Sequence, residues 1–251
     1  MRKLYYFLIF AFVFFSCKTE DKVSLHTASG ALYATLQITD IYKDSIAKKI
    51  DCNSASSGIL ARQINSGADA DIFISANSEW INFLIKNNKI KKESVTQLAL
   101  NSLVIISRKD KEPPVIKFDP EFDITNAIKN RIVIGNPEYV PAGRYTKAFL
   151  DKLNWYNSII DKAILATNVS ATLHYVEMGE ADWGVVYKSE ALQSNLVRID
   201  YQIPEQYYPE VIFYLCRLKT DNDDADKLFN FFMSDISRDI FIKNGFNTIN
   251  E

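Results

Sequence analysis

Residues 54–76 read SASSGILARQINSGADADIFISA and contain one helix and one strand. After a run of small residues, apolar side chains at positions 60, 61 and 64 recur at helical spacing and predict a helix over Ile59–Ser66. The apolar, β-branched run Asp71–Ser75 predicts a buried strand. Because an amphipathic helix followed by a buried strand is the repeating unit of α/β proteins, this stretch indicates the fold class.

The same alternation of apolar runs and helical segments continues along the chain. Strands are predicted over Val23–His26, Asp71–Ser75, Leu103–Ser107, Ile132–Gly135, Trp183–Tyr187 and Val211–Leu215. Apolar stripes predict further helices over Ala31–Ile41 and Tyr145–Leu153, and one amphipathic helix at the C-terminus over Leu228–Phe241. The sequence therefore predicts an α/β protein with mainly parallel sheets flanked by helices.

Two surface segments rich in proline and charge are candidate lobe boundaries. They are Lys109–Pro120 and Ile203–Pro209, and each lies beside a predicted strand. Two such crossings imply that the C-terminal segment returns to the first lobe. We expect lobe 1 to comprise residues 23–103 and 213–251, and lobe 2 residues 104–212.

The N-terminus has the pattern of an export signal. Arg2 and Lys3 precede an apolar stretch that ends at Phe15, which is shorter than the roughly 20 residues of a membrane-spanning helix. Cys17, directly after Ser16, resembles a bacterial lipoprotein processing site, so residues 1–17 are expected to be a signal with Cys17 as the lipidation site. Residues 18–22 would form a polar tether at the membrane surface. The alternative is an ordinary signal with an incidental cysteine.

The composition argues against several functions. A net charge of −2 provides no basic field, so nucleic acid is not an expected partner. With only two histidines and no His/Cys cluster, no metal bound directly by protein side chains and no cofactor are expected. Cys52 and Cys216 are interpreted as buried thiols, although an oxidising compartment would also permit a disulfide.

Four predicted helices begin with small, neutral residues, and this recurrence is the main functional signal. The four starts are Thr27–Gly30, Ser54–Gly58, Pro141–Gly143 and Thr167–Ser170. The first turn of a helix carries unpaired N–H groups and a partial positive charge, so it can bind an anion. The alternative for each single start is ordinary helix capping by Ser, Thr or Asn. Convergence of all four, each past the carboxyl end of a strand, would favour an anion site.

The residue types at these starts define the expected chemistry. Ser29 and Ser57 can each donate from Oγ and the backbone, Ala142 and Val169 from the backbone alone, and Tyr187 from its phenol. Charge-assisted hydrogen bonds from neutral donors can hold a desolvated dianion without an arginine. A site made only of donors disfavours a protonated anion such as phosphate, which also needs an acceptor.

Several motifs resemble those of the molybdate-binding proteins of bacterial ABC transporters. They are SASSGILARQINSGADAD (54–71), IFISA (72–76), GNPEYVPAGRY (135–145) and WGVVY (183–187), and the resemblance runs in order from Val23 to Phe246. It implies a type II-like periplasmic-binding-protein fold, in which two α/β lobes are joined by a hinge and close on the anion.

The resemblance also implies a function and a site. By motif position, the oxyanion contacts fall on Ser29, Ser57, Ala142, Val169 and Tyr187. The implied protein is an exported, periplasmic or cell-surface monomer that captures molybdate or tungstate and delivers it to an ABC permease. The alternative within the same fold is a receptor for sulfate or another small anion.

An enzymatic function is less well supported by the sequence than a binding function. A hydrolase would use Ser29 or Ser57 as nucleophile, but neither lies in a Gly-x-Ser-x-Gly motif, and His26 and His174 have no evident acidic partner.

Other polar and aromatic residues are expected to have structural roles. Asp69 and Asp71 are assigned to a turn and the entry of a strand, and Arg62 to a surface or inter-lobe salt bridge. The tryptophans are assigned to packing, with Trp183 close enough to Tyr187 to report ligand binding.

Overall fold

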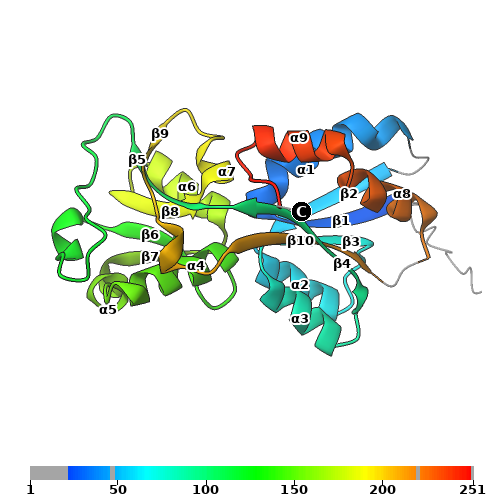
Figure 1. Cartoon of the computed structure of the whole chain (residues 1–251), viewed down its shortest axis with the longest axis horizontal. Coiled ribbons are helices and arrows are strands. Elements are labelled where there is room, and N and C mark those ends of the chain that lie inside the picture. Colours follow the sequence, from blue (N-terminus) through cyan, green and yellow to red (C-terminus); the bar gives the residue numbers. More distant parts are fainter. Residues whose placement is uncertain (1–21, 46–48, 219–220, 250–251) are drawn as a thin grey trace, which may run out of the picture.

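The computed structural model describes residues 22–45, 49–218 and 221–249, and its strands form two separate five-stranded sheets. Figure 1 shows the two sheets side by side, each with helices on both faces, so that the described chain has two lobes. The predicted α/β fold class is confirmed.

The first sheet has the strand order β2-β1-β3-β10-β4. Strand β1 pairs in parallel with β2 and β3, whereas β10 pairs antiparallel with β3 and β4. The strands span Lys22–Ala28 (β1), Lys49–Ala55 (β2), Ile72–Ser75 (β3), Ile90–Asn101 (β4) and Val211–Leu218 (β10). Lys22, expected at the end of the polar tether, already belongs to β1.

The second sheet repeats this arrangement with the order β7-β6-β8-β5-β9. Strand β6 is parallel to β7 and β8, and β5 is antiparallel to β8 and β9. The strands span Leu103–Arg108 (β5), Ile132–Gly135 (β6), Ala163–Ala166 (β7), Trp183–Tyr187 (β8) and Val197–Gln202 (β9). Both sheets are thus mixed, because the strands that follow each crossing between lobes run against their neighbours.

All six predicted strands are present, and the four additional strands are the edges of the two sheets: β2, β4, β7 and β9. Edge strands bury less side-chain surface than central ones, and β2 alternates exposed and half-buried residues along most of its length. Polar residues interrupt the apolar run in β2, β4 and β9. Strand β7 reads AILA and is apolar throughout, but it is only four residues long and its side chains are largely half-buried or exposed.

The helices cover both faces of each sheet. In the first lobe, α2 and α3 cover one face, and α1, α8 and α9 cover the other (Figure 1). In the second lobe, α4 and α5 lie opposite α6 and α7. The helices span Leu32–Tyr42 (α1), Ser57–Asn65 (α2), Ser78–Lys86 (α3), Pro141–Lys152 (α4), Tyr156–Ile159 (α5), Val169–Glu177 (α6), Lys188–Ala191 (α7), Asp223–Phe232 (α8) and Asp235–Lys243 (α9). Short 3₁₀ turns span Ser29–Ala31 (η1), Lys43–Ser45 (η2), Ile124–Ala127 (η3), Ile160–Lys162 (η4) and Glu205–Tyr207 (η5).

The prediction of one long C-terminal helix is wrong, because the segment forms two helices. The first ends at Phe232, and the Ser234 hydroxyl accepts a hydrogen bond from Ser237 N at 3.3 Å, which caps the second. Ile236, placed on the buried side by the one-helix pattern, is 53% exposed because the break rotates it outward.

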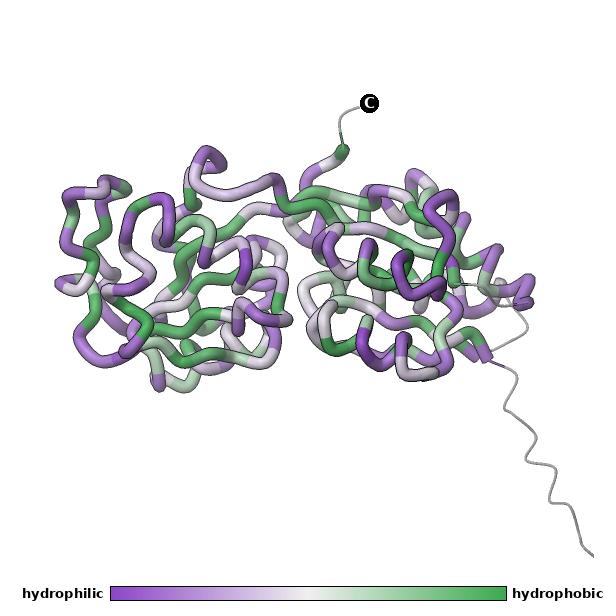
Figure 2. The backbone as a smooth tube through the Cα atoms, turned by 90° about the horizontal axis from the view of Figure 1, so that it is seen from below, coloured by the Kyte–Doolittle hydropathy of each residue, from purple (hydrophilic) through white to green (hydrophobic). Residues whose placement is uncertain are grey.

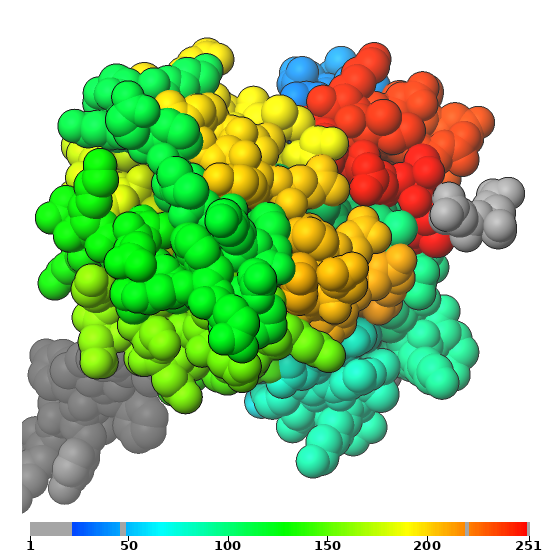
Figure 3. Space-filling view, turned by 60° about the vertical axis from the view of Figure 1, so that its left-hand side comes forward, coloured from blue at the N-terminus to red at the C-terminus, as the bar shows by residue number. Residues whose placement is uncertain are grey.

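The chain passes between the sheets twice. Only Ser102 separates β4 from β5, and residues 203–210 connect β9 to β10. The crossings lie side by side, since Ile203 N donates to Leu103 O at 3.0 Å. The expected divisions at 103/104 and 212/213 fall after these points, since Leu103 already belongs to the second sheet and Val211 to the first. Lys109–Pro120, expected beside a lobe boundary, lies between β5 and β6 of the second sheet. Figure 2 shows apolar residues concentrated in the interior of both lobes. Figure 3 shows the second lobe in front of segments of the first.

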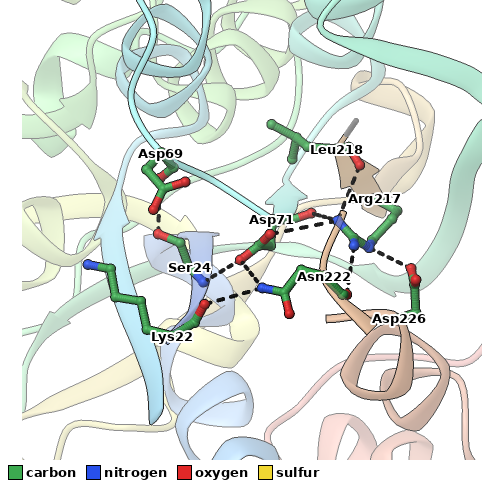
Figure 4. A network of polar contacts seen from close by, with 8 residues as sticks. All are labelled: Lys22, Ser24, Asp69, Asp71, Arg217, Leu218, Asn222 and Asp226. Carbon is green, nitrogen blue, oxygen red and sulfur yellow. Dashed lines mark hydrogen bonds and ion pairs between the residues drawn. The ribbon is translucent and has the colours of Figure 1, made fainter. Parts of the chain in front are cut away.

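A buried polar network ties the start of β3 to its neighbours (Figure 4). The Asp71 carboxylate accepts hydrogen bonds from Ser24 N at 2.8 Å and Asn222 Nδ2 at 2.9 Å, and Arg217 donates to Asp71 O at 3.0 Å. Asp69 O accepts from Ser24 Oγ at 3.0 Å. The assignment of Asp69 and Asp71 to strand entry is confirmed. These partners offset the cost of burying the Asp71 charge in the first lobe.

Cys52 and Cys216 are both free thiols. They lie on β2 and β10, which are separated in the sheet by β1 and β3. Burial raises the pKa of the Cys52 thiol to about 11, so it is protonated at neutral pH. In the part of the chain that the structure describes, no helix combines the length and apolar character needed to cross a bilayer.

Candidate functional site

A small cavity lies between the lobes, where strands of both sheets end. Its volume is about 10 Å³, which is room for about one water-sized sphere and far below the roughly 300–1,000 Å³ of pockets that hold drug-sized organic ligands. The cavity is lined by Ala28, Ser29, Gly30, Ser56, Ser57, Ala76, Val140, Pro141, Ala142, Val169 and Tyr187. The carboxyl ends of sheet strands are where α/β folds bind ligands.

All five site residues predicted from the sequence line this one cavity. Ser29 and Ser57 belong to the first lobe, and Ala142, Val169 and Tyr187 belong to the second. The four small-residue helix starts therefore converge, although they are spread over more than a hundred positions of the chain.

The cavity faces the first turns of three α-helices. Ser57 is the first residue of α2, Val169 is the first residue of α6, and Ala142 follows Pro141 at the start of α4. N–H groups at these positions have no partner within their own helix. Pro141 has no N–H, so Ala142 carries the first free donor of α4.

Helix capping is performed by the residues that directly precede Ser57 and Val169. The Ser56 hydroxyl accepts from Ile59 N at 3.4 Å, and the Asn168 amide oxygen accepts from Ala171 N at 2.8 Å. The capping alternative therefore applies to Ser56 and Asn168, and it does not account for Ser57 or Val169.

The Ser57 hydroxyl is held in position by the neighbouring strand. Its side chain is fully buried, and Oγ accepts a hydrogen bond from Ala76 N at 3.0 Å. Because the oxygen acts as acceptor toward Ala76, the hydroxyl proton remains available for a group in the cavity.

The Tyr187 phenol is buried without a hydrogen-bond partner. Its ring packs edge-on against Phe213 of the first lobe, with centroids 5.4 Å apart. Burial raises the pKa of Tyr187 well above its usual value, so the group stays protonated and can donate. A buried polar atom without a partner is costly, so this hydroxyl identifies a place where a ligand acceptor would be stabilising.

The lining contains no charged side chain, so its polar groups are hydroxyls and backbone amides. The described residues also contain no group of three or more His, Cys, Asp or Glu side chains that could hold a metal ion. The arrangement can donate several hydrogen bonds to one small anion, and no carboxylate is present to repel it.

The lobes touch beside the cavity through residues that the sequence analysis did not single out. Gly58 N donates to Tyr139 O at 3.1 Å, across the junction. A Cβ on Gly58 would lie 2.4 Å from that oxygen, so glycine is required for this approach. Tyr145 OH donates to Ala76 O at 3.4 Å, which adds a second bond between the lobes.

Two expectations about neighbouring residues are corrected. Arg62 makes no salt bridge among the described residues; its guanidinium lies 5.2 Å from the Trp80 ring centroid and 5.8 Å from that of Tyr139. Trp183 starts β8, four residues before Tyr187 and therefore roughly 13 Å from it. Trp80, which abuts Gly58, is the better reporter of the site.

The histidines lie away from the cavity lining. His26 Nε2 contacts Asp69 O at 3.0 Å, and His174 is 69% exposed beside Glu177. Among the described residues, neither histidine forms a hydrogen bond with Ser29 or Ser57. A hydrolase mechanism with either serine as nucleophile would therefore have no histidine base.

The buried Glu190, on α7 of the second lobe, is expected to make the stability of the fold depend on pH. Burial, together with the charge of Glu177, raises its pKa from 4.5 to about 7, partly offset by the Ser170 hydroxyl. The unfolded chain releases this proton near pH 4.5 and the folded chain near pH 7, so stability falls between these values and stays lower above them. The full loss is at most about 3 kcal/mol.

We expect Glu190→Gln to remove this dependence. The variant should be more stable than the wild type at pH 8, and the advantage should shrink as the pH falls toward 4. Urea unfolding of both proteins across this range measures the effect. A stability difference that is the same at pH 4 and pH 8 would contradict the assignment.

The fold and cavity together define a two-lobed receptor for a small anion. The chain matches the family model of bacterial extracellular solute-binding proteins over residues 25–247, and it belongs to that family, which comprises binding proteins and not enzymes.

Curated relatives and a solved structure agree with this placement. The chain is 34% identical over 237 residues to the putative ABC transporter substrate-binding lipoprotein YvgL of Bacillus subtilis, covering 92% of this chain and 89% of that protein. It is 31% identical over 229 residues to the molybdate-binding protein ModA of Escherichia coli, covering 90% and 89%. The substrate-binding domain of a putative molybdenum ABC transporter from Clostridium difficile superimposes with a TM-score of 0.68 at 28% identity, covering 91% and 99%.

Proposed function

We propose that this protein captures molybdate outside the cytoplasm and delivers it to an ABC permease. The observation that carries the proposal is the convergence of Ser29, Ser57, Ala142, Val169 and Tyr187 on one small, uncharged cavity between two lobes. The names of the Escherichia coli and Clostridium difficile relatives support molybdate as the cargo.

A lining of hydroxyls and backbone amides without any carboxylate supports a fully deprotonated dianion as ligand. A lining without carboxylates offers no strong acceptor for a protonated anion, so phosphate at neutral pH is disfavoured. Tungstate is a tetrahedral dianion of nearly the same size as molybdate, so it should bind as well. Sulfate has the same charge and shape in a smaller volume, which makes it the competing ligand.

A titration with four oxyanions tests the proposal. Calorimetry on the mature, unlipidated chain should give tight binding of molybdate and tungstate, with much weaker binding of sulfate and none of phosphate. Tight binding of sulfate alone would replace the proposed cargo while keeping the site. Absence of binding to all four would refute the proposal.

Ser57→Ala tests the contribution of the site residue with the best-defined geometry. We expect molybdate affinity to fall by about 1–3 kcal/mol, because one charge-assisted hydrogen bond is lost. Ala76 N also loses its acceptor, so a modest loss of stability should accompany the change. Calorimetric titration measures the affinity. Ser66→Ala, at the opposite, exposed end of α2, is the matched control and should bind as the wild type.

We further propose that the chain is exported and held at the membrane by a lipid on Cys17. The basic and apolar N-terminal pattern supports export, and the name of the Bacillus subtilis relative supports a lipoprotein. Cys17 lies outside the described residues. Mass spectrometry of the membrane fraction tests the anchor, because Cys17→Ser should release the protein in soluble form. We expect the mature protein to be a monomer in solution.

A further inference from the structure

Five side chains form a cluster where the two lobes meet beside the cavity. Arg62, Glu79 and Trp80 come from α2 and α3 of the first lobe, and Tyr139 and Arg144 come from the second. We call these five residues the latch cluster.

The latch cluster is held by contacts across the junction. The Arg144 guanidinium lies 5.0 Å from the Trp80 ring centroid and forms an ion pair with Glu79. The Arg62 guanidinium lies over both the Trp80 and Tyr139 rings, at 5.2 and 5.8 Å from their centroids. Two arginines thus contact the Trp80 indole. The Arg62–Tyr139, Arg144–Trp80 and Arg144–Glu79 contacts join the two lobes, and the Arg62–Trp80 contact lies within the first lobe. None of these side chains lines the cavity.

Some interactions within the latch cluster are unfavourable. The two guanidiniums repel each other, and burial together with the charge of Arg62 lowers the pKa of Arg144. Arg144 Nε and Trp80 Nε1 are buried without hydrogen-bond partners, so both would gain hydrogen bonds to water if the lobes parted. The contacts favour the closed arrangement of the lobes, and the repulsion and the two unsatisfied donors offset part of that gain. A small additional interaction can therefore shift the equilibrium between closed and open lobes.

A dianion in the cavity would shift that balance. Arg62 is five residues after Ser57 on α2, and Arg144 is two residues after Ala142 on α4. Each cation therefore lies within about two turns of a helix start that faces the cavity. Negative charge between these starts attracts both guanidiniums and offsets their mutual repulsion.

We propose that the latch cluster holds the lobes together over the bound anion and sets the rate at which the anion leaves. The role in anion release rests on the proposed function. The latch residues position the lobes and do not contact the anion, so they control its residence time without selecting between anions.

Stopped-flow kinetics of molybdate binding to the mature chain test the proposal. Arg144→Met should raise the dissociation rate by about 2- to 30-fold, the effect of losing one cation–π contact. Glu79→Gln should raise it less, by up to about 5-fold, because its ion pair with Arg144 is partly exposed. The association rate should change less. Arg144→Lys keeps the charge and should recover part of the lost residence time. The preference for molybdate over sulfate should stay as in the wild type.

Two controls separate the latch from general effects. Arg238→Met removes an exposed ion pair with Asp235 on α9 and should leave both rates unchanged. Small-angle X-ray scattering without added anion should give a larger radius of gyration for Arg144→Met than for the wild type, because the lobes part more often.

The outcomes for the latch and for the proposed function are distinguishable. If the wild type binds molybdate and the dissociation rates of Arg144→Met and Glu79→Gln equal its own, the latch is overturned and the function stands. If the wild type binds no molybdate, the function fails and the scattering data decide on the latch. Equal radii would then overturn it.

Discussion

Gly58→Ala is expected to weaken molybdate binding by about 100-fold or more, because it keeps the lobes apart. The new Cβ would lie 2.4 Å from Tyr139 O and 2.6 Å from the Trp80 ring. Tyr139 O is backbone of the opposite lobe, so only a separation of the lobes relieves that contact. Separation removes the donors of one lobe from the anion, and loss of two charge-assisted bonds at about 1.5–3 kcal/mol each accounts for the expected factor.

Calorimetry and thermal unfolding together test this expectation. Most of the effect should fall on affinity, since the backbone clash is between lobes. Gly143→Ala provides the contrast, because its Cβ would lie 2.0 Å from Gly135 O within the second lobe and should mainly reduce stability. Gln63→Ala, an exposed change on the same helix as Gly58, should alter neither quantity. Wild-type affinity in Gly58→Ala would refute the closed arrangement of the lobes.

Tyr187→Phe is expected to change affinity and stability in opposite directions. Molybdate binding should weaken by about 10- to 150-fold, because one charge-assisted donor is lost. The anion-free protein should become more stable, since the variant no longer buries a hydroxyl without a partner. A rise in the unfolding midpoint without anion, together with a weaker calorimetric affinity, is the expected result.

Tyr201→Phe is the matched control for this substitution. Tyr201 OH donates to Pro114 O at 3.1 Å and accepts from Ile116 N at 3.2 Å, so its removal should lower stability. Affinity should stay unchanged, because Tyr201 does not line the cavity. If Tyr187→Phe behaved like Tyr201→Phe, Tyr187 would be a structural residue and not a ligand donor.

The parts of the fold that could be predicted from sequence are those with a complete hydrophobic pattern. Central strands such as β6 and β8 are fully buried and read as continuous apolar runs. The edge strand β4 contains IKKESVTQ, in which three consecutive exposed residues, Lys91 to Glu93, interrupt the apolar run. The break between α8 and α9 was missed because the apolar spacing continues across Ser234, and only the capping bond of that residue starts a new helix.

The cavity could be predicted because its residues act through their position at helix starts. Small neutral residues before a helical pattern are visible in the sequence, as at Ser57 and Val169. The residues that join the lobes have no such signal in the sequence. Gly58 and Tyr139 meet across 81 positions of the chain, and neither lies in a periodic pattern that would indicate the contact.

The two adjacent crossings between the sheets have a mechanical consequence. With only Ser102 between β4 and β5, and with that crossing bonded to the other through Ile203, few torsion angles are free to change. A motion confined in this way is a rotation about one axis, and sliding of one sheet past the other would break the shared hydrogen bonds. We expect the angle between the lobes to be the single variable that changes when an anion binds. A membrane partner that touches both lobes would then sense occupancy from the outer surface alone.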